Sequence, residues 1–152
     1  MNARSRLLGT WELTEAKLLS DGVASDYEFA PQKGGGGILI YSPDGYMCAT
    51  LSKLERARFS TDQVDGGTDE EKAKAYSTYI SYVGSFEVDE NKMSVTHLVK
   101  FVLHPNYVGR SLIRYLVFSG TEGRSGDEVR LDTPPMNIGG KPVASYLKWR
   151  KV

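Results

Sequence analysis

The sequence contains little of the chemistry that marks several large classes of protein. Its 152 residues include one cysteine, Cys48, and two histidines, and its 19 Lys and Arg residues balance 19 Asp and Glu residues. A single cysteine excludes an internal disulfide and is typical of a reducing compartment. The net charge of zero lacks the basic excess that nucleic acids and anionic membranes attract. We therefore expect neither nucleic acid nor a membrane among its partners.

Long apolar runs are also absent. The residues before Gly9 contain only one pair of adjacent leucines, so we expect no signal peptide. No segment approaches the roughly 18 apolar residues that a membrane span needs. Together with the lone cysteine, these absences predict a soluble, cytoplasmic protein. The length is that of one domain, and we expect residues 1–152 to form it.

Glycine and tyrosine, by contrast, are plentiful, with 16 and nine residues, which favours a β protein rich in turns. The segment Ser42-Pro43-Asp44-Gly45 has the residues that a hairpin turn requires. Pro134-Pro135 is expected to end a strand, because proline cannot donate to a ladder. The pattern predicts eight strands, at residues 8–19, 38–41, 46–51, 82–88, 92–103, 110–119, 128–133 and 143–152.

One helix is predicted, over residues 68–80. Thr68 and Glu71 have the spacing of an N-terminal capping box. Four apolar residues follow at helical spacing, namely Tyr76, Tyr79, Ile80 and Val83. We expect this face to pack against the sheet.

The two ends of the chain suggest that the sheet closes on itself. Gly9-Thr10-Trp11 opens the first strand and Trp149-Arg150 lies in the last. We expect Trp11 to plug one end of a barrel and Arg150 to stack over it. A closed barrel of about 150 residues commonly encloses a pocket for a small molecule.

Taken in order, these segments resemble the lipocalin-like domain family of small stand-alone microbial proteins. The resemblance covers nearly the whole chain and rests on Leu8-Gly9-Thr10-Trp11, residues 37–51 with their turn, residues 66–71, residues 84–88, Val95-Thr96-His97, residues 105–109, Arg114-Tyr115 and Thr133-Pro134-Pro135. It implies an all-β fold, a closed eight-stranded antiparallel lipocalin-like barrel with one short mid-chain helix and a small-molecule cavity. It implies no single activity, although some members accompany secondary-metabolite pathways.

Strand register predicts which residues face that cavity. A hairpin centred just after Pro105 places His97 opposite Arg114. The preceding turn, just after Glu90, places Gly84 opposite His97, which would leave open space beside the imidazole. The same face carries Tyr82, Gly84, Phe86, Val95, His97, Val99, Phe101, Leu112, Arg114 and Leu116. It is apolar except for Tyr82, His97 and Arg114, and we expect it to line the cavity.

Arg114 on such a face needs an anionic partner, because an unpaired buried guanidinium is costly. That partner is either a ligand carboxylate or enolate, or an internal glutamate such as Glu12, Glu15 or Glu87. In the second case Arg114 is a structural residue.

His97 and Tyr82 also have two interpretations. His97 is able to exchange protons near neutral pH, and Tyr82 is able to donate a hydrogen bond. With Arg114 they are the candidate catalytic residues. Alternatively, His97 is a hydrogen-bonded core residue and Tyr82 serves packing. The predicted ligand-binding residues around them are Gly84, Phe86, Val99, Phe101, Leu112, Leu116 and Cys48, the last as a small core residue.

Three functions remain open from the sequence. The first is a barrel that binds a small hydrophobic metabolite and acts as a cofactor-free cyclase, isomerase or dehydratase on a polyketide- or terpenoid-like intermediate. The second is a carrier or sensor that only binds a small hydrophobic or weakly acidic molecule, and the third is a barrel filled with side chains. His97 and His104 point to opposite faces, so we expect no metal and no cofactor. A homodimer is left open.

Overall fold

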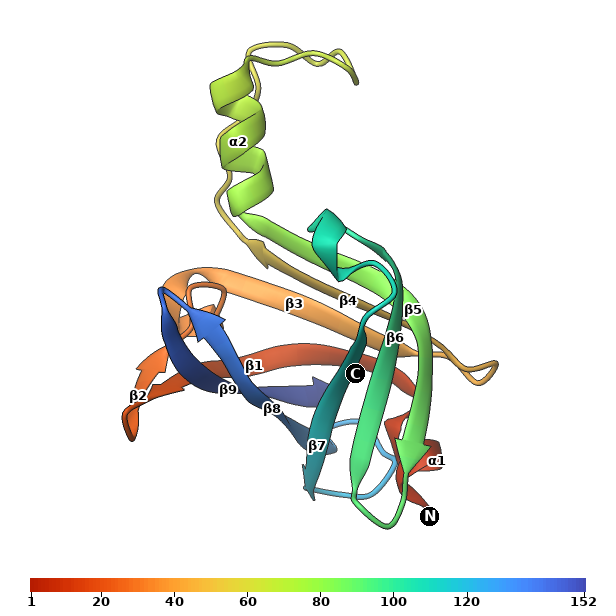
Figure 1. Cartoon of the computed structure of the whole chain (residues 1–152). Helices are drawn as coiled ribbons and strands as arrows, with labels where there is room; N and C mark the ends of the chain where they lie inside the picture. Colours follow the sequence, from red (N-terminus) through yellow and green to blue (C-terminus); the bar gives the residue numbers. More distant parts are fainter.

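The computed structural model describes all 152 residues and shows one antiparallel sheet of nine strands, ordered β2-β1-β3-β4-β5-β6-β7-β8-β9, with β1 also paired to β9 (Figure 1). In chain order the elements are α1 (Ala3–Leu7), β1 (Gly9–Ser20), β2 (Val23–Asp26), the 3-10 turn η1 (Pro31–Lys33), β3 (Gly35–Tyr41), β4 (Tyr46–Lys53), α2 (Asp69–Ser77), β5 (Tyr79–Asp89), β6 (Ser94–Val102), the 3-10 turn η2 (Pro105–Tyr107), β7 (Ser111–Ser119), β8 (Glu128–Ile138) and β9 (Lys141–Lys151). The sheet therefore curls into a closed barrel.

The long first strand makes the closure possible. Residues 9–12 of β1 pair with β3, and residues 11–19 pair with β9 across a bulge between Leu13 and Glu15. Bulges of this kind bend a strand and help a sheet to curl. The predicted eight-stranded antiparallel barrel is confirmed, with β2 as one extra strand.

Strand β2 pairs only with the end of β1, through a turn with positive φ at Asp21 and Gly22. The Asp-Gly pair is a hairpin signal that the prediction overlooked.

The barrel has a closed end, formed by α1, Trp11 and Lys151. The Trp11 side chain is fully buried, and its indole N–H donates to the carbonyl of Leu7 at 2.7 Å. Lys151 is paired with Trp11 across the strands and holds its ammonium 4.8 Å from the ring centre. The predicted stacking of Arg150 is wrong, because strand alternation turns Arg150 outward, where it pairs with Glu128.

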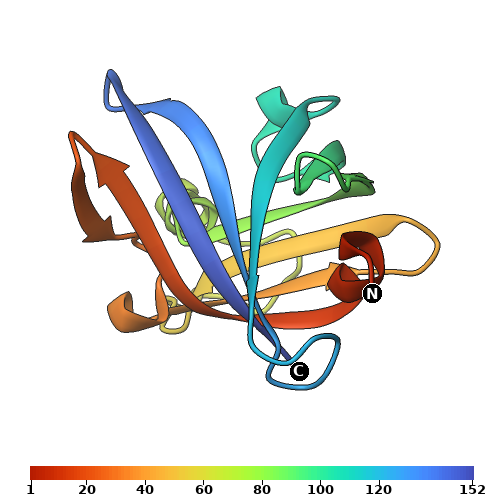
Figure 2. The same cartoon turned by 90° about the horizontal axis from the view of Figure 1, so that it is seen from below.

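The view from below shows this closed end (Figure 2). Strands β1 and β9 run next to each other there, and the C-terminus lies beside the loop between β7 and β8. A backbone hydrogen bond from Gly126 to the carbonyl of Lys151 ties that loop to the last strand. The opposite end of the barrel lies beside α2 and η2, and no helix covers it (Figure 1).

Helix α2 does not pack against the barrel as predicted. It has no buried residue and stands away from the strands (Figure 1). Of the four residues predicted to form an apolar helix face, only Tyr76 lies in the helix. The other three, Tyr79, Ile80 and Val83, belong to β5, so the predicted face does not exist. Thr68 caps the helix as predicted, accepting a hydrogen bond from the backbone of Glu71.

Strand β8 also differs from its prediction, because it continues past Pro134-Pro135 to Ile138. The prolines lie where the register with β9 shifts, between Thr133 and Met136, and β7 pairs with β8 only as far as Asp132. Since the ladder is interrupted at this bulge, the missing proline N–H groups do not end the strand.

Candidate ligand pocket

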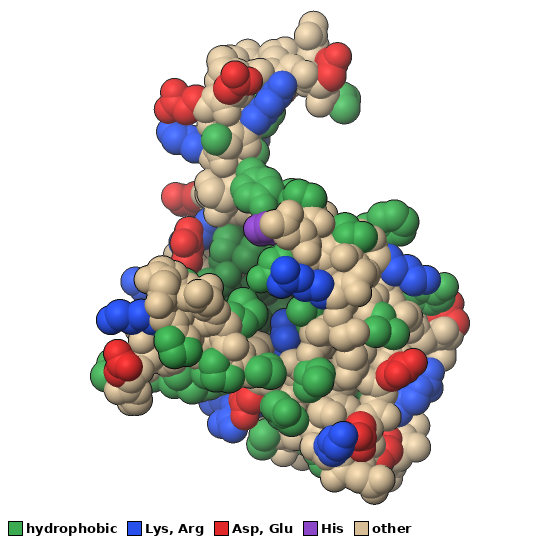
Figure 3. All heavy atoms as spheres, in the orientation of Figure 1, with side chains coloured by type: hydrophobic (Ala, Val, Ile, Leu, Met, Phe, Trp, Pro, Cys, Tyr) green, Lys and Arg blue, Asp and Glu red, His purple; other side chains and the backbone are tan.

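A cavity of about 400 Å³ occupies the barrel and opens beside α2 and η2. Of its 26 lining residues 20 are hydrophobic, and the space-filling view shows a hollow lined largely by such side chains (Figure 3). The outer rim includes exposed Tyr76 and Ile138, whereas Leu39 and Trp149 in the lining are buried. Its size lies within the roughly 300–1,000 Å³ typical of small-molecule pockets.

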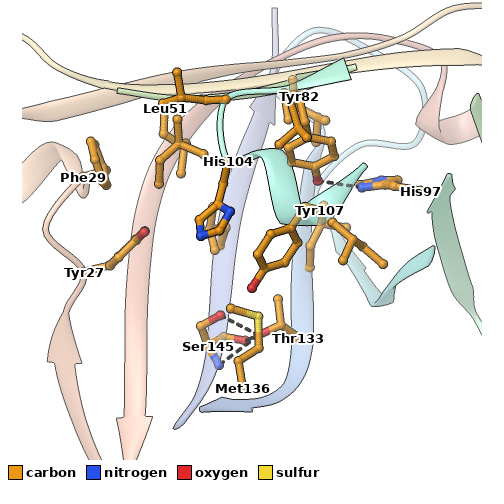
Figure 4. Close-up of a pocket in the computed structure, with 18 of the residues that line it drawn as sticks. Tyr27, Phe29, Leu51, Tyr82, His97, His104, Tyr107, Thr133, Met136 and Ser145 are labelled. Carbon is orange, nitrogen blue, oxygen red and sulfur yellow. Dashed lines mark hydrogen bonds between the residues drawn. The ribbon is translucent and has the colours of Figure 1, made fainter. Parts of the chain in front are cut away.

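His97 lies in the wall of this cavity, and Figure 4 shows its hydrogen bond to Tyr82. A second tyrosine, Tyr41, bonds the other ring nitrogen. The Nε2 of His97 lies 2.7 Å from the hydroxyl of Tyr41 on β3, and its Nδ1 lies 2.8 Å from the hydroxyl of Tyr82 on β5. Burial, together with the positive charge of Arg114, lowers the pKa of His97 to about 3. The imidazole is therefore neutral at physiological pH. Burial also raises the pKa of both tyrosines, so both phenols keep their protons.

Arg114 is the single charged residue of the lining. Its guanidinium donates to the carbonyl of Ile113 at 2.9 Å. No carboxylate oxygen lies within 4.0 Å of its nitrogen atoms, the distance that defines a salt bridge. The glutamates considered as internal partners are elsewhere: Glu12 and Glu87 are exposed, and Glu15 contacts Tyr146 and Lys148. The interpretation of Arg114 as half of an internal ion pair is therefore wrong.

The β6–β7 pairing explains how Arg114 still reaches the pocket. His97 is opposite Leu112, and Arg114 is opposite Val95, because η2 centres the hairpin one residue earlier than predicted. The predicted pairing is therefore off by two residues. Two residues is the side-chain period of a strand, so Arg114 keeps the same face as His97.

The cavity brings together five of the predicted residues: Tyr82, His97, Val99, Leu112 and Arg114. Two others, Phe86 and Leu116, are buried in the core but do not line the cavity. Phe86 contacts Tyr41 edge to face, with ring centres 4.8 Å apart. It therefore supports the wall of the cavity from behind.

A bulge between β5 and β6 overturns the placement of Phe101 and Gly84. Gly84 is opposite Val99, while Val83 is opposite Phe101, so Lys100 is an extra residue. The bulge turns Phe101 outward, where it is 74% exposed. A Cβ on Gly84 would lie 1.9 Å from the carbonyl oxygen of Leu98, so this glycine permits close strand contact and leaves no open space for a ligand.

Cys48 also lies outside the pocket. On β4 the buried residues alternate as Met47, Ala49 and Leu51, which leaves Cys48 on the other face. There its neighbours in the sheet are Ile40 and Val83. The strand was predicted correctly, but the prediction assigned Cys48 to the wrong face.

Several pocket residues were missed by the sequence prediction. They are Tyr27, Phe29, His104, Tyr107, Thr133, Met136, Ser145 and Trp149 (labelled in part in Figure 4). The alternation of Ser145, Leu147 and Trp149 along β9 was the signal available for this strand. Trp149 is 2% exposed, and its indole N–H has no acceptor in the protein.

No three His, Cys, Asp or Glu side chains come together in the way that a metal ion requires. Neither helix has the length and apolar character needed to cross a membrane.

The fold and cavity define a barrel of the kind that holds one small molecule. The model of the lipocalin-like domain matches residues 8–152, and the chain belongs to this family. It is also similar to the 4'-hydroxy-3'-methoxypropiophenone carrier protein ppsC of Aspergillus oryzae (strain ATCC 42149 / RIB 40). The two are 33% identical over 93 residues, which cover 57% of this chain and 78% of that protein.

Proposed function

We propose that this protein is a carrier for a small, mainly apolar molecule that bears an oxygen atom able to accept hydrogen bonds, such as an aryl ketone. The observation that carries the proposal is Arg114, whose guanidinium lines an otherwise uncharged cavity and has no carboxylate partner. A half-buried guanidinium in an apolar lining favours such a partner, and a ligand oxygen would supply it. The name of the similar carrier protein, which refers to an aryl ketone, supports the same class of ligand.

The state of His97 favours binding over proton transfer. A general acid or base works best when its pKa lies near the working pH, whereas that of His97 is lowered to about 3 by burial and by Arg114. Both ring nitrogens are also occupied by Tyr41 and Tyr82. His97 is therefore a poor proton donor or acceptor toward a ligand.

A cofactor-free isomerase, cyclase or dehydratase is the second candidate. It is supported by the presence of Tyr82 and Arg114 in the same lining, because a phenol and a guanidinium are suited to stabilise an enolate. The substrate would be a polyketide- or terpenoid-like carbonyl compound. The experiment below distinguishes this candidate from the carrier.

The test is calorimetric titration of the purified protein with 4'-hydroxy-3'-methoxypropiophenone. We expect saturable binding of one molecule per chain, and we expect Arg114→Leu to weaken it about tenfold or more, since a hydrogen bond to a charged group contributes roughly 1.5–3 kcal/mol. Arg124→Leu is the matched control, because Arg124 is exposed and lies outside the pocket. Absence of binding, or equal weakening by both variants, would contradict the proposal.

Mass spectrometry of the bound compound decides between carrier and enzyme. Recovery of the unchanged compound supports the carrier. A product that is isomeric with the compound, or one water lighter, would make the protein an enzyme instead. The same measurement on a metabolite extract, with a folded His97→Ala/Arg114→Leu double variant as the control, extends the test to other ligands.

A further inference from the structure

The hydrogen bonds around His97 specify which way each proton points. Tyr41 is 1% exposed, and its hydroxyl has one hydrogen-bond partner, Nε2 of His97. A buried O–H without an acceptor costs about 1–3 kcal/mol. The Tyr41 hydroxyl therefore donates to Nε2, which must carry no proton.

This bond determines the tautomer of His97. A neutral imidazole has one N–H, and the burial that lowers the pKa of His97 keeps the ring neutral. Because Nε2 accepts from Tyr41, the proton is on Nδ1. The Nδ1–H group then donates to the hydroxyl oxygen of Tyr82 at 2.8 Å.

The consequence appears at Tyr82, which lines the cavity. Its oxygen already accepts from His97, and no protein group accepts its own hydrogen. The Tyr82 O–H is therefore free to donate toward the cavity. The guanidinium of Arg114, which donates to the carbonyl of Ile113, also lines the cavity, and it is a donor only.

We infer that Tyr41 and His97 act as positioning residues that hold the Tyr82 hydroxyl as a donor, so that the pocket selects a carbonyl oxygen over a hydroxyl group at this position. The inference rests on the proposed carrier function and specifies its ligand class. A ketone oxygen accepts from these donors and carries no hydrogen of its own. An alcohol brings an O–H that meets no acceptor among them, and a buried unpaired donor is disfavoured.

The first test needs no ligand. The nitrogen chemical shifts of His97 in the free protein, measured by NMR, report its tautomer. We expect a protonated Nδ1 and an unprotonated Nε2. The opposite tautomer would overturn the inference whatever the protein binds.

The second test compares propiophenone with 1-phenylpropan-1-ol, which differs only by reduction of the carbonyl. We expect the wild-type protein to bind the ketone on the order of tenfold more tightly. Tyr82→Phe should remove most of this preference. It should also reduce the shift of the bound ketone's carbonyl stretch to lower frequency in the infrared spectrum.

Tyr41→Phe is the decisive variant. Without the Tyr41 hydroxyl, His97 is free to adopt either tautomer, so Tyr82 is able to accept as well as donate. The preference for the ketone should fall several-fold while the ketone still binds. Phe86→Leu is the matched control, since Phe86 packs against the Tyr41 ring but makes none of these hydrogen bonds, and we expect it to keep the preference.

The outcomes separate the two proposals. Tight but equal binding of ketone and alcohol by the wild-type protein would overturn the selectivity and leave the carrier function standing. Equal weakening of both compounds by Tyr41→Phe would make Tyr41 merely structural and overturn its positioning role. Failure of the wild-type protein to bind either compound would contradict the proposed function itself.

Discussion

Arg6 at the closed end and Arg114 in the pocket are both partly withdrawn from water, but their surroundings differ. Arg6 donates two hydrogen bonds, of 2.8 and 2.9 Å, to the carboxylate of the fully buried Asp127. Asp127 also accepts from the backbone of Gly123 and Glu128. Arg114 lies beside a backbone carbonyl and the Tyr82 hydroxyl but has no carboxylate partner. Pairing at one end stabilises the fold, whereas the missing partner at the other end leaves a charge available for a ligand.

The two tryptophans show the same contrast. The indole N–H of Trp11, at the closed end, donates to Leu7. The indole N–H of Trp149, in the pocket lining, has no acceptor. Both side chains are almost completely buried, so the difference lies in hydrogen bonding and not in exposure. The closed end thus gives its guanidinium a carboxylate and its indole N–H an acceptor, whereas Arg114 and Trp149 of the pocket lack these partners.

The largest effect expected at the closed end is that of Trp11→Ala. The change should lower the free energy of unfolding by about 3–5 kcal/mol, as other large truncations in a core do. Chemical denaturation monitored by circular dichroism measures it. Trp149→Phe keeps a ring and breaks no hydrogen bond within the protein, so its loss should be clearly smaller. A loss below about 1 kcal/mol for Trp11→Ala would contradict the assignment of Trp11 as the plug.

Asp127→Ala should cause the next largest loss of stability. It leaves the Arg6 guanidinium, whose side chain is 17% exposed, without its carboxylate, and breaking a buried pair from one side costs about 3 kcal/mol or more. The same denaturation experiment measures the loss. The double change Arg6→Met/Asp127→Ala should recover part of it, because no unpaired charge remains. If the double variant is less stable than Asp127→Ala, the pair does not act in this way.

A pH-dependent effect on the free energy of unfolding is expected in the pocket. The pKa of His97 is lowered from 6.5 to about 3, so between these values the unfolded chain binds a proton that the folded protein does not. Stability should therefore fall as pH falls through this window, by up to about 1.4 kcal/mol per pH unit. The groups facing His97 are Tyr41, Tyr82 and Arg114, and none of them is a carboxylate that would oppose the shift.

His97→Gln is the control for this pH dependence. The amide is able to bond both tyrosines but does not titrate. Carboxylates contribute to the pH dependence of both proteins, so the difference between the two stability profiles isolates His97. Identical slopes for wild type and variant would show that His97 is not held neutral by its surroundings.

The smallest effect on stability is expected for Arg114→Leu. Because Arg114 has no carboxylate partner, its loss should change the free energy of unfolding by less than about 1 kcal/mol, in contrast to Asp127→Ala. Thermal and chemical denaturation without ligand measure it. A loss as large as that of Asp127→Ala would make Arg114 structural and remove the difference between the two ends.

Much of the barrel was accessible to prediction because its strands alternate with a period of two. Because of that period, part of the site prediction stayed correct: the predicted register was off by two residues, which left Arg114 and His97 on the same face. The same rule failed at Phe101, because one extra residue in a bulge reverses the face. It failed at Cys48 because alternation alone does not say which face of β4 is inside.

The amino-acid pattern by itself determined the class of fold, the number of barrel strands and the shared face of Tyr82, His97 and Arg114. Only the tertiary structure decided that Tyr41, 56 residues from His97, completes the hydrogen-bonded chain, and that Arg114 has no internal partner. The physical reason is the range of each interaction. Turn residues and alternation act between near neighbours in sequence, whereas the environment of a pocket side chain depends on strands brought together by closure of the whole barrel.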